Sequence, residues 1–291
     1  ISCSLVGSEM CIRDRLKVVL FKLKFLGAVE QIGMEKITSR SNNLIKHTKK
    51  LFTSHKERAL SSQFALEGAR LCFDALHSEC GADLLLLTED AARKYPEKCT
   101  QLIDGFEKTV WITGELASYL SETKNPQGVF AVCSPRKNVF YPEKGKKYIA
   151  LDQIQDPSNL GAVIRTAEAL GIDGALLSGC CDLYNPKVLR ASMGGAMRLP
   201  VLLCEDLALE ITNLRAQGFH AYASVPDRSA ENIKHIAFNG SDICVIGNEG
   251  NGVSQAVKQA CTGLLTIHML GRAESLNASV AAAIIMWEML S

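Results

Sequence analysis

Short apolar runs alternate with amphipathic stretches along the C-terminal half of the chain. Runs at 148–151, 175–178, 221–225, 243–246 and 264–267 predict strands, because each holds only four or five residues. The stretches between them predict helices, namely 159–170, 186–197, 205–217, 252–260 and 275–290. Continuous apolar strands that alternate with helices are typical of a parallel sheet with both faces covered. We therefore expect an α/β domain over 147–291.

The preceding part of the chain has the same kind of pattern on a smaller scale. Apolar runs at 63–66, 83–88, 109–112 and 129–133 alternate with helical stretches at 68–78 and 114–121. This pattern predicts a small α/β domain over 34–135. A polar segment that contains proline and glycine follows, and it predicts a linker over 136–146.

The first 33 residues are expected to be a non-native or disordered extension. Residue 1 is Ile, residues 1–15 resemble translated adapter sequence, and Met34 begins a stretch typical of a normal start. The apolar segment 16–29 contains three lysines and is too short and too charged to span a membrane. A genuine extension is the alternative, and it would leave the other predictions unchanged.

Basic residues are concentrated just after this extension. Residues 36–58 contain seven Lys and Arg against one acidic residue, with Leu44, Ile45 and Leu51 at helical spacing between them. The segment predicts a basic amphipathic helix. A run of charge is usually a solvated helix face, but the imbalance favours contact with phosphate groups. The whole chain carries a net charge of only +1, so only such a local patch supports nucleic-acid binding.

The 11 cysteines and six histidines give little support to a metal site. The cysteines are odd in number, form no C-x-x-C pair and lie mostly inside apolar runs. The histidines form no H-E-x-x-H motif. We expect reduced thiols, a cytoplasmic protein and no bound metal.

Three loops after predicted strands carry the candidate chemistry. Ligands of parallel sheets bind beyond the carboxyl ends of the strands, where these loops lie. The first, 156–167, predicts a helix start, with Arg165 close enough to the N-terminus to oppose the helix dipole. Such an arginine favours an anionic partner, and the alternative is a surface pair with Glu168.

The second loop, 247–254, has three glycines within six residues, and Glu249 projects from it. It lacks the lysine of a P-loop, because Val253 stands there, and its glycine order is not that of a dinucleotide fingerprint. A glycine-rich turn with a solvated glutamate is the alternative interpretation. The third loop, 267–277, offers Ser275 and Asn277 as caps for the last helix.

Together, N-x-G-A-x-x-R-T-A, G-N-E-G-N-G-V-S and I-x-M-x-G-x-x-E-S-L-N-x-S-V-A-A-A resemble the three motifs of the SpoU/TrmH family of RNA ribose 2′-O-methyltransferases. The resemblance covers about 148–290. Segments 37–40, 44–46, 66–70 and 125–129 resemble the family's N-terminal substrate-binding domain, which has a ribosomal-protein-L30-like fold. His268 and Asn43 each stand where proline is usual, and neither position touches a reacting group.

The resemblance implies a SPOUT fold, in which a C-terminal trefoil knot on the parallel sheet binds S-adenosyl-L-methionine. Arg165 would stabilise the negative charge that develops on the ribose hydroxyl, because a guanidinium is a poor general base. Asn159, Glu249 and Asn277 would orient the substrate and the motif backbone. The implied cofactor-binding residues are Gly247, Ile267, Met269, Ser275 and Leu276.

The resemblance also implies the partners. We expect a homodimer that binds RNA, with ribosomal RNA of the large subunit preferred over tRNA, and no membrane partner. The implied RNA-binding residues are Arg40, Lys46, Lys49 and Lys50. A tRNA 2′-O-methyltransferase and a non-catalytic RNA-binding factor of the same fold remain alternatives. A dehydrogenase or NTPase is a third, and it lacks the necessary motifs.

Overall fold

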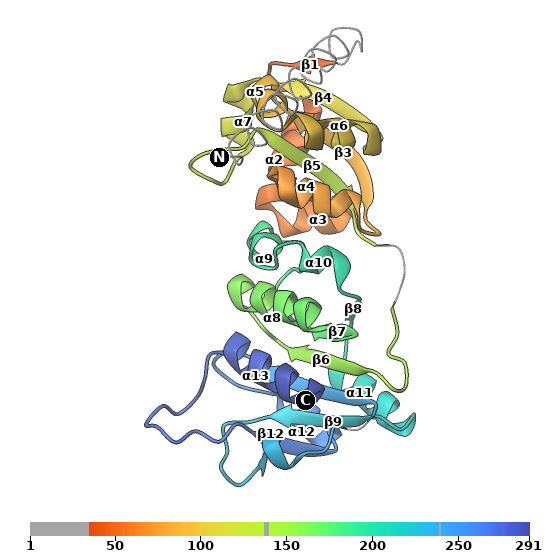
Figure 1. Cartoon of the computed structure of the whole chain (residues 1–291), viewed down its shortest axis with the longest axis vertical. Coiled ribbons are helices and arrows are strands. Elements are labelled where there is room, and N and C mark those ends of the chain that lie inside the picture. Colours follow the sequence, from red (N-terminus) through yellow and green to blue (C-terminus); the bar gives the residue numbers. More distant parts are fainter. Residues whose placement is uncertain (1–34, 137–139, 239) are drawn as a thin grey trace, which may run out of the picture. The chain divides into compact units, whose positions relative to one another are not determined.

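The computed structural model describes residues 35–136, 140–238 and 240–291 (Figure 1). The expected extension 1–33 lies outside the described residues. The chain divides into two compact units between Pro135 and Arg136. Each unit is described by itself.

The first unit is a five-stranded mixed sheet with the order β1-β4-β3-β5-β2. β1, β4 and β3 run parallel, while β5 runs antiparallel to both β3 and β2. Its apolar core lies between the sheet and the helices α2 and α7. Its elements are β1 (Lys36–Ile37), α2 (Asn43–Thr53), α3 (His55–Ser61), β2 (Phe64–Glu67), α4 (Ala69–Leu76), β3 (Gly81–Leu87), α5 (Glu89–Lys94), α6 (Pro96–Gly105), β4 (Lys108–Ile112), α7 (Gly114–Leu120) and β5 (Val129–Ser134).

The basic segment does not form one helix over 36–58, so that prediction was wrong. Residues 36–37 form a strand, and the helical part is divided at Ser54, whose backbone is extended. The Ser54 side chain accepts a hydrogen bond from the backbone N–H of Glu57, which starts α3 as a separate helix. Serine at a helix N-cap satisfies a backbone donor that the helix cannot, so it favours a new start over continuation.

The second unit is a seven-stranded sheet with the order β10-β12-β9-β11-β6-β7-β8, and every pairing is parallel. The expected α/β class with a parallel sheet is confirmed. Its elements are β6 (Lys147–Asp152), α8 (Pro157–Leu170), β7 (Gly174–Ser178), α9 (Pro186–Ala191), α10 (Gly195–Arg198), β8 (Val201–Leu203), α11 (Leu207–Ala216), β9 (His220–Ser224), β10 (Glu231–Asn232), the 3₁₀ helix η1 (Ile233–His235), β11 (Asp242–Gly247), α12 (Gln255–Ala260), β12 (Gly263–Thr266) and α13 (Ala278–Leu290).

The strand order places two of the three candidate loops side by side. β7 and β8 lie between β6 and one edge of the sheet, and the later strands β9 to β12 lie on the other side of β6. β6 and β11 are therefore neighbours at the point where the order reverses, with Asp152 in register with Gly247. Open α/β sheets bind ligands at this kind of reversal.

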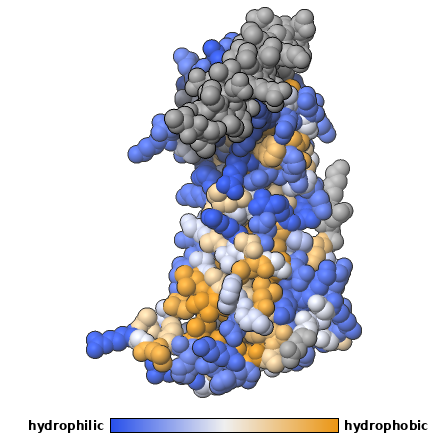
Figure 2. Space-filling view, viewed as in Figure 1, coloured by the Kyte–Doolittle hydropathy of each residue, from blue (hydrophilic) through white to orange (hydrophobic). Residues whose placement is uncertain are grey.

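Helices cover both faces of this sheet (Figure 1). α8 and α13 pack together on one face of the sheet. α11 and α12 pack together on the other face, where they contribute to an apolar core. α13 buries Ala282, Ile285 and Met286 but leaves Ile284 and Trp287 exposed. Figure 2 shows apolar side chains gathered over this helix.

Candidate functional site

A chain of side-chain hydrogen bonds connects the three candidate loops. Asn159, the third residue of α8, donates from Nδ2 to Oε1 of Glu249 at 3.0 Å. Oδ1 of Asn159 accepts from Nδ2 of Asn277, also at 3.0 Å. Oδ1 of Asn277 in turn accepts from the backbone N–H groups of Ser279 and Val280, which caps α13. One carboxylate and two amides thus join loops that lie about 90 and 118 residues apart in sequence.

Besides its hydrogen bond with Asn159, Glu249 also binds the loop that follows β6. Its carboxylate accepts from the backbone N–H groups of Gln155 at 3.2 Å and Asp156 at 3.1 Å. Desolvation alone would raise the pKa of Glu249, but the hydrogen bonds from Asn159 and from backbone N–H groups outweigh it and leave the pKa below its ordinary value. Glu249 is therefore a charged anchor at neutral pH. The residue is exposed, as the alternative interpretation expected, but three hydrogen bonds also fix its carboxylate.

Asn248 closes the glycine-rich loop on itself. Its backbone exchanges two hydrogen bonds with Gly252, and its Oδ1 accepts from the N–H groups of Gly250 and Asn251. Its Nδ2 donates to the carbonyl of Gln153, a residue with φ +60°. The amide therefore ties the second loop to the first.

Gly247 is required by this closure. A Cβ there would lie 2.0 Å from the backbone nitrogen of Val253, a distance that no side chain can occupy. The neighbouring carboxylate of Asp152, which is 3% exposed, accepts from the N–H of Ser254 at 2.7 Å. Sequence reasoning did not single out Asp152, Gln153 or Asn248. A buried acid at the end of an apolar strand was the one available signal.

A cavity of about 520 Å³ opens beside these loops. It is lined by 224–226, 246–250, 252, 266–267, 269, 274–278 and 281. The lining includes all five residues predicted to bind the cofactor, together with Glu249 and Asn277. The wall combines apolar side chains, glycines and polar side chains, and a volume of this size suits a small-molecule ligand.

Arg165 does not line this cavity. It is the ninth residue of α8 and is exposed. The argument from the helix dipole was wrong, because α8 begins at Pro157 and the dipole acts within the first turn. The alternative pair with Glu168 is also wrong, since that carboxylate binds Nε of Arg198 at 2.7 Å. Within the described residues of one chain, Arg165 forms no hydrogen bond or ion pair with the other three predicted catalytic residues.

The four predicted RNA-binding residues lie on the first unit. The guanidinium of Arg40 and the ammonium of Lys49 both lie over the ring of Tyr119, at 4.9 and 5.5 Å from its centroid. Nζ of Lys50 lies 3.7 Å from Oε2 of Glu57 in α3, and Lys46 is exposed on α2. Arg40 and Lys49 thus form a basic cluster around an aromatic ring.

The described part of the chain contains no group of three or more His, Cys, Asp or Glu side chains placed to hold a metal ion. None of the helices over 35–136, 140–238 and 240–291 is both long and apolar enough to cross a membrane. The nine cysteines in these ranges are free thiols.

Comparison with known proteins identifies the class. Residues 146–287 match the SpoU rRNA Methylase family, and residues 42–131 match the MRM3-like substrate binding domain. The chain is 33% identical over 258 residues to a Bacillus subtilis protein named 23S rRNA (guanosine(2553)-2'-O)-methyltransferase RlmP, covering 88% of this chain and 99% of that protein. The chain belongs to the SpoU rRNA methylase family, as the motifs predicted.

Two solved structures are similar along both units. An AdoMet-bound rRNA methyltransferase from Sinorhizobium meliloti has a TM-score of 0.77 at 26% identity, covering 88% of this chain and 97% of that one. The SpoU methyltransferase AviRb from Streptomyces viridochromogenes, in complex with AdoMet, has a TM-score of 0.75 at 26% identity, covering 86% and 97%. The similarity confirms the expected SPOUT class with an additional N-terminal domain.

Proposed function

We propose that this protein transfers a methyl group from S-adenosyl-L-methionine to a ribose 2′-hydroxyl of RNA, with large-subunit ribosomal RNA as the substrate. The observation that carries the proposal is the hydrogen-bond chain Asn277–Asn159–Glu249, which holds three family motifs around one cavity. The B. subtilis relative, which this chain matches over nearly its full length, is named as an enzyme of this kind.

The cavity residues fit the cofactor. Val225, Ile246 and Leu276 supply apolar walls for an adenine ring, and the glycines at 250 and 252 leave the backbone accessible to it. When bound, S-adenosyl-L-methionine supplies a sulfonium methyl group as the electrophile. The residues proposed to hold it are Gly247, Ile267, Met269, Ser275 and Leu276.

The protein's own task is to position a poor nucleophile and to stabilise its charge. Arg165 is proposed to lie at the 2′-hydroxyl and stabilise the negative charge that develops there. We propose three positioning residues, Asn159, Glu249 and Asn277, because each forms a hydrogen bond with another loop. A preorganised loop costs no reorganisation when the substrate binds.

The position of Arg165 outside the cavity supports a homodimer in which one copy supplies Arg165 to the cavity of the other. The exposed apolar residues Val280, Ile284 and Trp287 lie on one side of α13, at spacings of four and three residues, and a second copy would cover them. We further propose that the segment leading into α13 forms the trefoil knot.

The first unit is proposed to bind the RNA. Arg40, Lys46, Lys49 and Lys50 would contact phosphates, and the half-buried ring of Tyr119 would hold Arg40 and Lys49 together at this surface. The proposed division is a substrate-binding domain over 34–135, a linker over 136–146 and a methyltransferase domain over 147–291. The cytoplasmic location and the absence of a metal stay predictions from the cysteines and histidines.

Transfer of tritiated methyl groups to unmodified rRNA and tRNA tests the reaction. We expect label in rRNA with the wild type, at least a hundredfold slower transfer with Arg165→Ala, and unchanged cofactor binding in that variant. Arg215→Ala removes an exposed arginine of α11 and should transfer normally. Cofactor binding without transfer to either RNA by the wild type would contradict the proposal and favour a non-catalytic binding factor.

Mixing two inactive variants tests the shared site. Arg165→Ala chains retain the cavity, and Asn277→Ala chains retain Arg165. If the site is built from two copies, equal mixing should restore about a quarter of wild-type activity, because half of the dimers are mixed and each has one intact site. No recovery, with mixed dimers demonstrated by differently tagged chains, would place Arg165 and the cavity in the same copy.

A further inference from the structure

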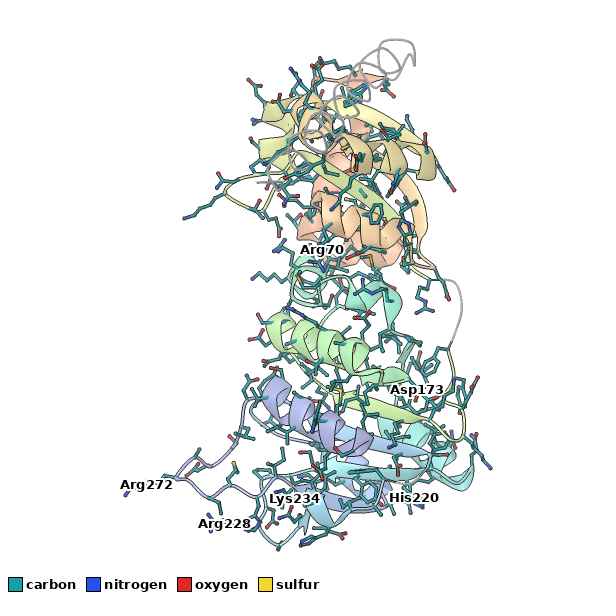
Figure 3. The ribbon with its side chains drawn as sticks, viewed as in Figure 1. Arg70, Asp173, His220, Arg228, Lys234 and Arg272 are labelled. Carbon is teal, nitrogen blue, oxygen red and sulfur yellow. The ribbon has the colours of Figure 1, made fainter. Side chains whose placement is uncertain are left out.

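A second cavity, of about 530 Å³, lies next to the cofactor cavity. The two share parts of their walls, including Thr266, Ile267 and Met269. Its outer walls come from the loop after β9 and the loop after β12. Figure 3 shows Arg228 on the first of these loops and Arg272 at the outer end of the second. The second cavity is therefore adjacent to the proposed cofactor site.

The charge of this cavity is positive. Arg228 and Arg272 line it, both are exposed, and neither forms a hydrogen bond or ion pair with any residue of the described ranges. Glu274 is the one acidic residue of its lining. Asp227, next to Arg228, points its carboxylate at the N–H and hydroxyl of Ser229, which lower its pKa. Two arginines thus line the cavity against one acidic residue.

We propose that Arg228 and Arg272 bind a phosphodiester of the RNA beside the ribose that is methylated, an inference that rests on the proposed function. A guanidinium donates two parallel hydrogen bonds to phosphate oxygens and keeps its charge at any physiological pH. A ribose whose 2′-hydroxyl reaches the first cavity carries phosphodiesters at its own 3′ and 5′ positions. Because the second cavity adjoins the first, we place one of these phosphodiesters there.

The amino-acid end of the cofactor, which carries a carboxylate, is the other group that could reach this cavity. That end carries an ammonium as well as a carboxylate and is neutral overall, so an excess of positive charge suits it less well than it suits a phosphodiester. The first cavity is also large enough to hold a cofactor by itself. The arginines are therefore assigned to the RNA.

The test measures RNA binding and cofactor binding separately. Arg228→Ala, Arg272→Ala and the double variant are compared with wild type for binding of an unmodified large-subunit rRNA fragment over a series of salt concentrations, and for binding of S-adenosyl-L-methionine by calorimetry. Lys144→Ala is the matched control. It removes an exposed cation just before β6, at the opposite, amino edge of the sheet.

We expect the slope of log K against log salt to fall by about 0.7 for each arginine removed, because each phosphate contact releases counterions. The KM for RNA should rise about tenfold or more in the double variant. Affinity for the cofactor should be unchanged, which also shows that the variants are folded. Arg→Lys variants should restore the slope, since they restore the charge. The control should match the wild type.

Two results would overturn the inference. An unchanged salt slope in variants of a wild type that methylates RNA would remove the arginines from the RNA interface and leave the proposed function intact. Weaker cofactor binding with an unchanged slope would assign the cavity to the amino-acid end of the cofactor. Failure of the proposed function looks different: the wild type would transfer no methyl group to RNA, whatever the slopes.

Discussion

Replacing Asn159 by alanine should destabilise the second unit far more than its size suggests. The side chain is 8% exposed, donates to the charged Glu249 and accepts from Asn277. Loss of one hydrogen bond to a charged group and one between neutral groups costs about 2–4 kcal/mol of unfolding free energy, which is the net contribution of two such bonds after exchange with water. Asn213, an exposed residue of α11, is the control, and its alanine variant should change stability by less than about 0.5 kcal/mol.

The chain's two tryptophans make the measurement specific. Trp111 lies in the first unit and Trp287 on α13, so the fluorescence of Trp287 in a Trp111→Phe background reports on the second unit alone. Urea unfolding at one fixed protein concentration gives the free energy, since a dimer's stability depends on concentration. A loss for Asn159→Ala no larger than that for Asn213→Ala would refute the claim that the three loops are held by this side chain.

Two further predictions concern the same unit. Gly247→Ala should cost about 1–3 kcal/mol of unfolding free energy, because its Cβ would overlap the backbone of Val253. Gly250→Ala should be tolerated, because the nearest neighbour of its Cβ would be 3.6 Å away. Thermal unfolding of both variants checks this, and equal stability of the two would contradict it. The hydrogen bond from Arg198 lowers the pKa of Glu168 in the folded protein below the value of about 4.5 that it has in the unfolded chain. The pair therefore stabilises the fold fully above pH 4.5. This stabilisation is lost as the pH falls through the pKa of the folded state. Glu168→Gln should therefore cost about 0.5–1 kcal/mol at pH 7 and progressively less as the pH falls below 4.5, measured by urea unfolding. A cost that stays the same in acid would exclude this cause.

Five strands of the parallel sheet were predictable because each is a continuous apolar run between polar loops, namely β6, β7, β9, β11 and β12. β10 was missed, because it is only two residues long and both are polar. β8 was missed, since Val201–Leu203 is only three residues long and its last residue is 66% exposed. The helix predicted over 186–197 is two helices, α9 and α10. Met193 and Gly194 both have positive φ, which a right-handed helix cannot contain.

The motifs located the site, but the sequence alone did not reveal its internal connections. Glu249 accepts from backbone groups 93 and 94 residues away, and no local pattern encodes such a contact. Parallel sheets create these contacts by bringing distant strand ends together at one edge. The position of Arg165 was misjudged for a similar reason, because the start of α8 at Pro157 decides how far that residue lies from the helix end.

The central claim is that the methyl group goes to a ribose 2′-hydroxyl of large-subunit rRNA. Alkaline hydrolysis of rRNA methylated by the wild-type protein tests it directly, since a 2′-O-methyl group blocks cleavage of the adjacent phosphodiester. The account predicts label in a single alkali-resistant dinucleotide, and none with Arg165→Ala. Label recovered in ordinary mononucleotides, which means methylation of a base, would contradict it.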